Sequence, residues 1–138
     1  MKRQLIQHPG ARTRALYSWE TEEIFLDRRN VRFDQRAADR FARDFWEWRG
    51  RDGCAVPKIA ITMHGDISFC IGRSDITLHI QETGPVILLH ELVHARGFGT
   101  SKRMHPVSFV KYYIDCLSLF VGYNRSDLTA SAMMRGLV

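Results

Sequence analysis

The chain has 138 residues and a formal net charge of +5, and 45% of its residues are hydrophobic. These values are typical of one soluble globular domain, so we expect a single domain over residues 1–138, and they exclude collagen-like and disordered chains. No apolar run approaches the roughly 18 to 20 residues that cross a bilayer. The first ten residues lack the apolar segment of a secretory signal. Three cysteines without a CxxC spacing favour a reducing compartment, and we expect a cytoplasmic protein without a membrane partner.

The positive charge is concentrated in the first part of the chain. Residues 1–51 carry 12 basic and 8 acidic side chains, whereas residues 52–138 carry 8 and 7. This excess indicates either a surface that binds nucleic-acid phosphates or, as we favour, a solvated arginine-rich helix. We expect residues 1–12 to be a loose basic leader. Residues 16–26 mix apolar and acidic side chains without a clear period, and we assign them no secondary structure.

A helical pattern runs from Asp34 to Arg49. Apolar residues recur in it at three- and four-residue spacing, and oppositely charged residues pair at i, i+4 on the other side. The apolar set consists of Ala37, Ala38, Phe41, Phe45 and Trp48. These aromatic residues and Trp46 either stack on nucleic-acid bases or pack in the core, and helical spacing favours the core.

Three short runs of alternating apolar residues follow, at 58–63, 67–71 and 76–80. Turn-forming residues separate them, so we expect a meander of antiparallel strands. Because the strands lie between helical segments, the sequence predicts an α+β fold. Its small, mostly antiparallel sheet of three or four strands would pack on the helix at 34–49 and on a central helix at 85–97.

Three more helices are expected after the strands. The first covers residues 85–97 and has proline at its first position, which tolerates proline. The second covers residues 105–122, and a short last helix begins at about Ser126, which with Asp127 offers capping groups. The apolar stripe of the second helix consists of Val110, Tyr113, Ile114, Leu117, Phe120 and Val121.

The central helix contains the sequence HExxH, formed by His90, Glu91 and His94. On a helix the two histidines lie about 40° apart, so both imidazoles can bind one zinc ion. Glu91 lies about 100° from His90, where its carboxylate can take a proton from zinc-bound water as a general base. The opposite side of the helix is apolar and consists of Leu88, Leu89, Leu92 and Val93.

A catalytic zinc site needs a third protein ligand and an open fourth position. Thr100 stands where the metzincin pattern HExxHxxGxxH has its last histidine, and threonine is a poor zinc ligand. Asp115 lies two turns into the next helix, away from the ligand side. We favour His105, which begins that helix eleven residues after His94 and leaves the chain room to turn back.

Two segments resemble a known family. The sequence HELVHA at 90–95 followed by HPVSFV at 105–110 is similar to the HExxH…H(G/P)xxF arrangement of compact zincins related to SprT and Spartan. More narrowly, it resembles a family of metallohydrolases from mycobacteria, other actinobacteria and their phages. The resemblance extends to RALYSWE at 14–20, similar to that family's basic-VYxxE opening, and to the closing segment 120–137. It implies a zincin-like fold, zinc on His90, His94 and His105, and Glu91 as base, and it supplies no substrate.

Several other residues allow two interpretations. His79 either lines a cleft beside a strand that pairs with an extended peptide, or is an exposed strand histidine, which we favour. His64 and Asp66 either form a second metal site or, more simply, a turn. The three cysteines are expected to pack as small apolar side chains: Cys54, Cys70 and Cys116.

The motif favours a zinc-dependent hydrolase, most simply a small metallopeptidase of gluzincin-like layout that acts on a peptide or protein substrate. The alternatives are a zinc-stabilised binding or regulatory module, and a DNA-associated protease of the Spartan type. Zinc hydrolases commonly also place a hydrogen-bond donor at the developing oxyanion. Helix geometry puts Tyr112 almost in line with His105 and Tyr113 in the apolar stripe, so Tyr112 is the predicted donor and Tyr113 a core residue.

Overall fold

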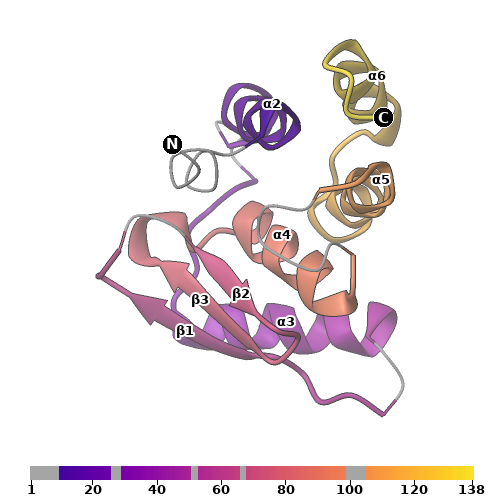
Figure 1. Ribbon diagram of the computed structural model, residues 1–138. Helices are drawn as coiled ribbons and strands as arrows, with labels where there is room; N and C mark the ends of the chain where they lie inside the picture. Colours follow the sequence, from indigo (N-terminus) through magenta and orange to yellow (C-terminus); the bar gives the residue numbers. More distant parts are fainter. Residues whose placement is uncertain (1–9, 26–28, 51–52, 66–67, 99–104) are drawn as a thin grey trace.

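The computed structural model describes residues 10–25, 29–50, 53–65, 68–98 and 105–138. Within them the fold is α+β, with five α-helices and one three-stranded mixed sheet (Figure 1). The elements in chain order are α2 (Ala11–Trp19), η1 (Glu20–Ile24), α3 (Gln35–Arg49), β1 (Lys58–Thr62), β2 (Phe69–Ile71), β3 (Asp75–His79), η2 (Ile80–Glu82), α4 (Pro85–Arg96), α5 (Val107–Cys116), η3 (Leu117–Val121) and α6 (Arg125–Met134). No helix of the described residues is long and apolar enough to span a bilayer.

A helix precedes the segment where the sequence predicts the first one. Because α2 starts at Ala11 and continues through the π-helical turn η1 to Ile24, the prediction of a loose leader is wrong for residues 11 and 12. Residues 1–9 lie outside the described part of the chain. The buried face of this helix includes Thr13, Leu16 and Glu20 at three- and four-residue spacing. Its two polar members conceal the helical period in the sequence.

Helix α3 is confirmed within the predicted bounds. The Asp34 carboxylate caps it by accepting a hydrogen bond of 2.8 Å from the backbone N–H of Ala37. Phe45 and Trp46 are buried, as the core interpretation expects. Trp48 is 75% exposed, so its assignment to the apolar face is wrong. The buried face instead follows Ala38, Ala42 and Phe45, and Trp48 lies to one side of that line.

The sheet corrects the predicted antiparallel meander. Its strand order is β1-β3-β2, with β3 parallel to β1 and antiparallel to β2. Side chains alternate in the same way in both arrangements, so the alternation in the sequence does not distinguish them. The segment between β1 and β3 contains β2 and serves as the crossover. Over Asp75–Thr77, β3 has a neighbour on each side, so this described part of the strand before α4 has no free edge for an extended peptide.

Helix α4 is the centre of the fold. It packs on the sheet, on α3 and on α5, and α5 contacts α6 (Figure 1). Its N-terminus is capped from a distant segment, because the Asn30 side-chain oxygen accepts a hydrogen bond of 3.2 Å from the backbone N–H of Val86. A Cβ at Gly84 would lie 2.4 Å from that oxygen, so a larger residue there would displace the cap. Helix α4 ends at Gly97, whose φ of 116° is unfavourable for other residues.

The two C-terminal helices agree with the expected order. Within the predicted stripe Val110, Tyr113, Ile114 and Leu117 are buried, whereas Phe120 and Val121 are partly buried. Helix α6 begins one residue before Ser126. Its cap is Asn124, whose side chain accepts a hydrogen bond from the backbone N–H of Asp127, and not the predicted pair of Ser126 and Asp127.

Candidate metal centre

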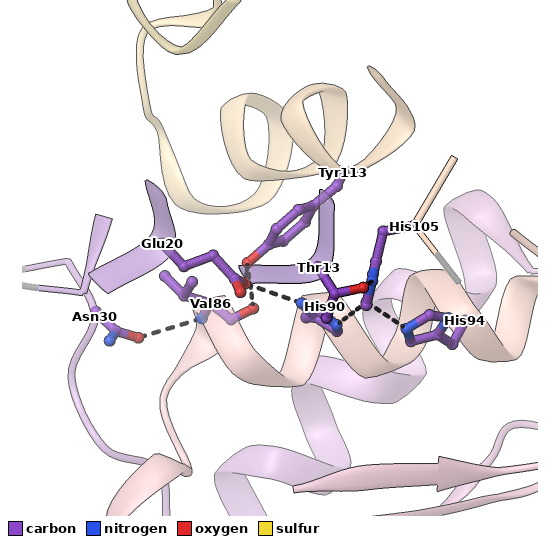
Figure 2. A network of polar contacts seen from close by, with 8 residues as sticks. All are labelled: Thr13, Glu20, Asn30, Val86, His90, His94, His105 and Tyr113. Atoms are coloured by element: carbon purple, nitrogen blue, oxygen red, sulfur yellow. Dashed lines mark hydrogen bonds and ion pairs between the residues drawn. The ribbon is translucent and has the colours of Figure 1, made fainter. Parts of the chain in front are cut away.

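Three histidines converge at the point where α4 meets the start of α5. His90 and His94 lie one turn apart on α4, and His105 stands two residues before α5 (Figure 2). The Nε2 atom of His105 lies 3.1 Å from Nε2 of His90 and 3.2 Å from Nε2 of His94. All three side chains are at most 5% exposed. The structure therefore brings together the three residues that the sequence predicts as metal ligands.

The other ring nitrogen of each histidine is engaged by the protein. His90 Nδ1 lies 2.9 Å from the Glu20 carboxylate, and His94 Nδ1 lies 3.1 Å from the carbonyl oxygen of Phe98. Because both partners are acceptors, these Nδ1 atoms carry protons, and the Nε2 atoms are the ring nitrogens that face the cluster. His105 Nδ1 lies 3.4 Å from the Thr13 hydroxyl. The converging Nε2 atoms are therefore arranged so that they could bind one cation.

The spacing of the cluster fits a small divalent ion. Zinc–nitrogen bonds of about 2.0–2.1 Å in a tetrahedral site place two nitrogens about 3.3 Å apart. Both separations from His105 Nε2 are close to this value, and the three ligand atoms lie within 4.8 Å of one another. Buried lone pairs that face one another repel unless a proton or a cation lies between them. The donor set thus fits the zinc ion that the motif predicts.

Glu20 is a site residue that the sequence analysis did not single out. Its side chain is 1% exposed and bonds His90, and its Oε2 atom also accepts a hydrogen bond of 2.6 Å from the Tyr113 hydroxyl (Figure 2). Tyr113 is buried, as predicted, and also contacts the carbonyl oxygen of Val86. A carboxylate on a ligand histidine fixes the ring and raises its basicity. No local pattern in the sequence marks Glu20, because the polar members of this buried helix face conceal its period.

The local charges act on the protonation of this network. Burial lowers the pKa of His90, but the negative charge of Glu20 and its hydrogen bond raise it, and the resulting pKa is about 9. Burial and the nearby His90 and His94 lower the pKa of His105 to about 2, so this imidazole stays neutral, the form that binds metals. Burial and Glu20 raise the pKa of Tyr113 well above its usual value, which keeps its hydroxyl protonated as a donor.

We expect Glu20→Gln to weaken zinc binding by about 10- to 100-fold, because it removes the charge that orients and polarises His90. A competition titration with a chromophoric chelator measures the dissociation constant. Glu22→Gln is the matched control, because Glu22 lies on the same π-helical turn and is exposed. An unchanged zinc affinity in Glu20→Gln would contradict this role.

The backbone of His105 is held by Arg12. The Arg12 guanidinium donates hydrogen bonds to the carbonyl oxygens of His105, Gly136 and Leu137, the last two at 3.3 and 2.6 Å. Helix α2 therefore ties the third histidine to the C-terminal segment. Together with the contact from Thr13, this places His105 from both its backbone and its ring.

We expect Arg12→Lys to bind zinc about tenfold less tightly, because lysine keeps the charge but cannot bridge three carbonyl oxygens. Stopped-flow mixing with excess chelator should show faster release of zinc. Arg43→Lys is the control, since Arg43 is an exposed arginine on α3. Equal release rates in the wild type and Arg12→Lys would show that Arg12 does not position the ligand.

Glu91 lies beside the cluster in a cavity of about 160 Å³. Its side chain is only 4% exposed. The lining residues come from α2, η1, α4 and the segments around β2 and η2: Tyr17, Glu20, Thr21, Phe25, Ser68, Glu82, Ile87, His90 and Glu91. The carboxylate predicted as general base is thus next to a space that can receive a substrate group.

Tyr112 is not directed toward this cavity. Its hydroxyl donates a 3.5 Å hydrogen bond to the carbonyl oxygen of Arg49, and its ring stacks on Phe98 at 4.3 Å. The structure therefore gives no support to the predicted oxyanion role. Tyr17, which the sequence analysis did not assign to the site, lines the cavity, and its ring centroid lies 5.9 Å from that of His105.

The remaining candidates lie elsewhere. Asp115 pairs with Arg125 at 3.1 Å, and Thr100 and Asp66 lie outside the described residues. His64 is exposed, and His79 accepts a hydrogen bond from the backbone N–H of Gln81 as the cap of η2. Among the cysteines, Cys116 is buried and Cys70 half-buried, whereas Cys54 is exposed, so its predicted packing is wrong.

Comparisons with protein-family models, with curated proteins and with solved structures found no match for this chain. The resemblance to SprT-like zincins therefore stays a prediction from the motif residues. The geometry of the three histidines, Glu20 and Glu91 indicates the chemistry that this chain can support.

Proposed function

We propose that this protein is a zinc-dependent hydrolase with a zincin-like site, acting as a peptidase. The observation that carries the proposal is the orientation of the cluster. Three buried imidazoles present Nε2 to one point, and each Nδ1 is engaged by another group of the protein. Side chains held in this way are pre-organised ligands.

The number of ligands favours catalysis over a purely structural ion. Structural zinc sites have four protein ligands, whereas catalytic sites have three and keep one position open. Among the described residues, the cluster able to hold an ion consists of the three histidines alone. The segment 99–104, between His94 and His105, contains no histidine, cysteine or acidic residue.

The chain's own groups supply the remaining chemistry. When bound, zinc would polarise a scissile carbonyl and make water a better nucleophile. Glu91 takes a proton from the attacking water and passes it to the leaving amine. Tyr17 lines the same cavity and donates its phenolic hydrogen to the substrate oxygen on which negative charge develops. Glu20 holds His90 through Nδ1 and does not touch the substrate.

The deciding experiment follows cleavage of a mixed peptide library by mass spectrometry, with the protein in zinc-loaded, chelator-treated and zinc-restored forms. We expect cleavage in the first and third forms only. Zinc content is measured on the same samples. A protein that retains zinc and melts at a higher temperature with it, but cleaves no peptide, would contradict the hydrolase and favour the zinc-stabilised binding module.

A further inference from the structure

The cavity beside Glu91 contains a second carboxylate that the proposed reaction does not use. Glu82, the last residue of η2, is half-buried and lines the same space as His90 and Glu91. Its Oε1 atom accepts hydrogen bonds from the backbone N–H of Ser68 at 3.2 Å and from the Ser68 hydroxyl at 3.1 Å. The carboxylate is therefore fixed in position.

The Ser68 hydroxyl also fixes the role of Glu82 as an acceptor. This hydroxyl accepts a 2.9 Å hydrogen bond from the backbone N–H of His79, so its own hydrogen is available for Glu82. Both groups that bond Oε1 are donors. This arrangement holds Oε1 of Glu82 as a hydrogen-bond acceptor in the cavity wall.

The charged side chains of the cavity lining are mainly carboxylates. The lining includes three carboxylates, those of Glu20, Glu82 and Glu91, and no lysine or arginine is among the lining residues that the structure describes. These three charges outweigh the two positive charges of one bound zinc ion. A substrate group with a positive charge is therefore favoured in this space over a neutral or negative one.

The shape of the cavity limits the size of that group. Phe25 and Ile87 form apolar parts of the wall. A cavity of roughly 150 Å³ holds a benzene molecule, and the volume here is about 160 Å³. A substrate group made of a short hydrocarbon stem and a terminal ammonium matches both the apolar wall and the carboxylates of this cavity. The stem contacts the apolar wall, and the ammonium reaches the carboxylate.

We infer that Glu82 is a specificity-determining residue that selects substrates with an ammonium group close to the scissile bond. This inference rests on the proposed function. The ammonium belongs either to a lysine-like side chain or to a free α-amine, and both present the same chemistry to Glu82. The two sources are separated by the probes below.

The test measures binding of three hydroxamates to the zinc-loaded protein by calorimetry, because a hydroxamate binds zinc without turnover. N-acetyl-lysine hydroxamate carries a side-chain ammonium, norleucine hydroxamate carries only the α-ammonium, and N-acetyl-norleucine hydroxamate carries neither. We expect one ammonium probe to bind about tenfold more tightly than the neutral probe. In Glu82→Gln, which keeps an acceptor for Ser68, this preference should fall to about one while affinity for the neutral probe is unchanged.

Glu47→Gln is the matched control, because it removes one carboxylate from an exposed position on α3 and should keep the full preference. Equal binding of all three probes to the wild type would overturn the inference while leaving the zinc site intact. A preference that survives in Glu82→Gln would also overturn it. Zinc content near zero together with no hydroxamate binding would instead contradict the proposed function itself.

Discussion

Replacing His105 by alanine should reduce the zinc content of the purified protein from about one ion per chain to near zero. The substitution removes the imidazole whose Nε2 atom lies 3.1 and 3.2 Å from the other two Nε2 atoms, and two histidines on one helix turn hold zinc only weakly. Metal content is measured by mass spectrometry after dialysis. The apo wild type should also gain stability on addition of zinc, by about 4 kcal/mol at a thousandfold excess over the dissociation constant.

The control for this experiment is His64→Ala, which removes an exposed histidine outside the cluster. It should keep both the zinc content and the zinc-dependent rise in melting temperature. Because His105 is buried, the alanine variant is compared with its own apo form, so that a packing defect is not mistaken for a lost ligand. Full zinc retention in His105→Ala would remove this residue from the ligand set.

Glu91→Gln should lower kcat by about a hundred- to ten-thousandfold on any peptide that the zinc-loaded wild type cleaves. The amide has nearly the same shape as the carboxylate but cannot accept the proton of the attacking water. Because Glu91 is not one of the three ligands, zinc content should be unchanged. The melting temperature should also stay close to that of the wild type.

These readouts separate a catalytic role from a structural one. An unchanged kcat in Glu91→Gln would contradict the general-base role. A large loss of melting temperature or of zinc would show that the buried Glu91 holds the fold or the ion instead. Glu47→Gln, an exposed change of the same chemistry, controls for the loss of one negative charge.

The sequence predicted the parts of the fold that depend on local patterns. Helices α3 and α5 follow from periodic apolar residues, α4 follows from its proline start and glycine stop, and the HExxH motif placed His90 and His94 on one face of α4. The choice of His105 over Asp115 rested on spacing, and the structure brings His105 to the other two histidines.

The features that escaped prediction depend on contacts between distant segments. The pairing of β1 with β3 is not encoded in side-chain alternation, which is the same for parallel and antiparallel neighbours. Glu20 lies 70 residues from His90 in sequence, and no local pattern marks it as a partner. Tyr112 was chosen by helix angle alone, whereas its contact with Arg49 joins two segments 63 residues apart in sequence.

The hydrogen bonds of Arg12 determine when during synthesis the backbone of His105 is held in place. Arg12 is among the first described residues, yet it bonds the carbonyl oxygen of Leu137, 125 residues later. The ribosome must therefore have added residue 137, and that residue must have left the exit tunnel, before this hydrogen bond can form. His90 and His94, in contrast, come together as soon as α4 forms. On a nascent chain the two histidines of α4 are therefore placed relative to each other before His105 is held against them.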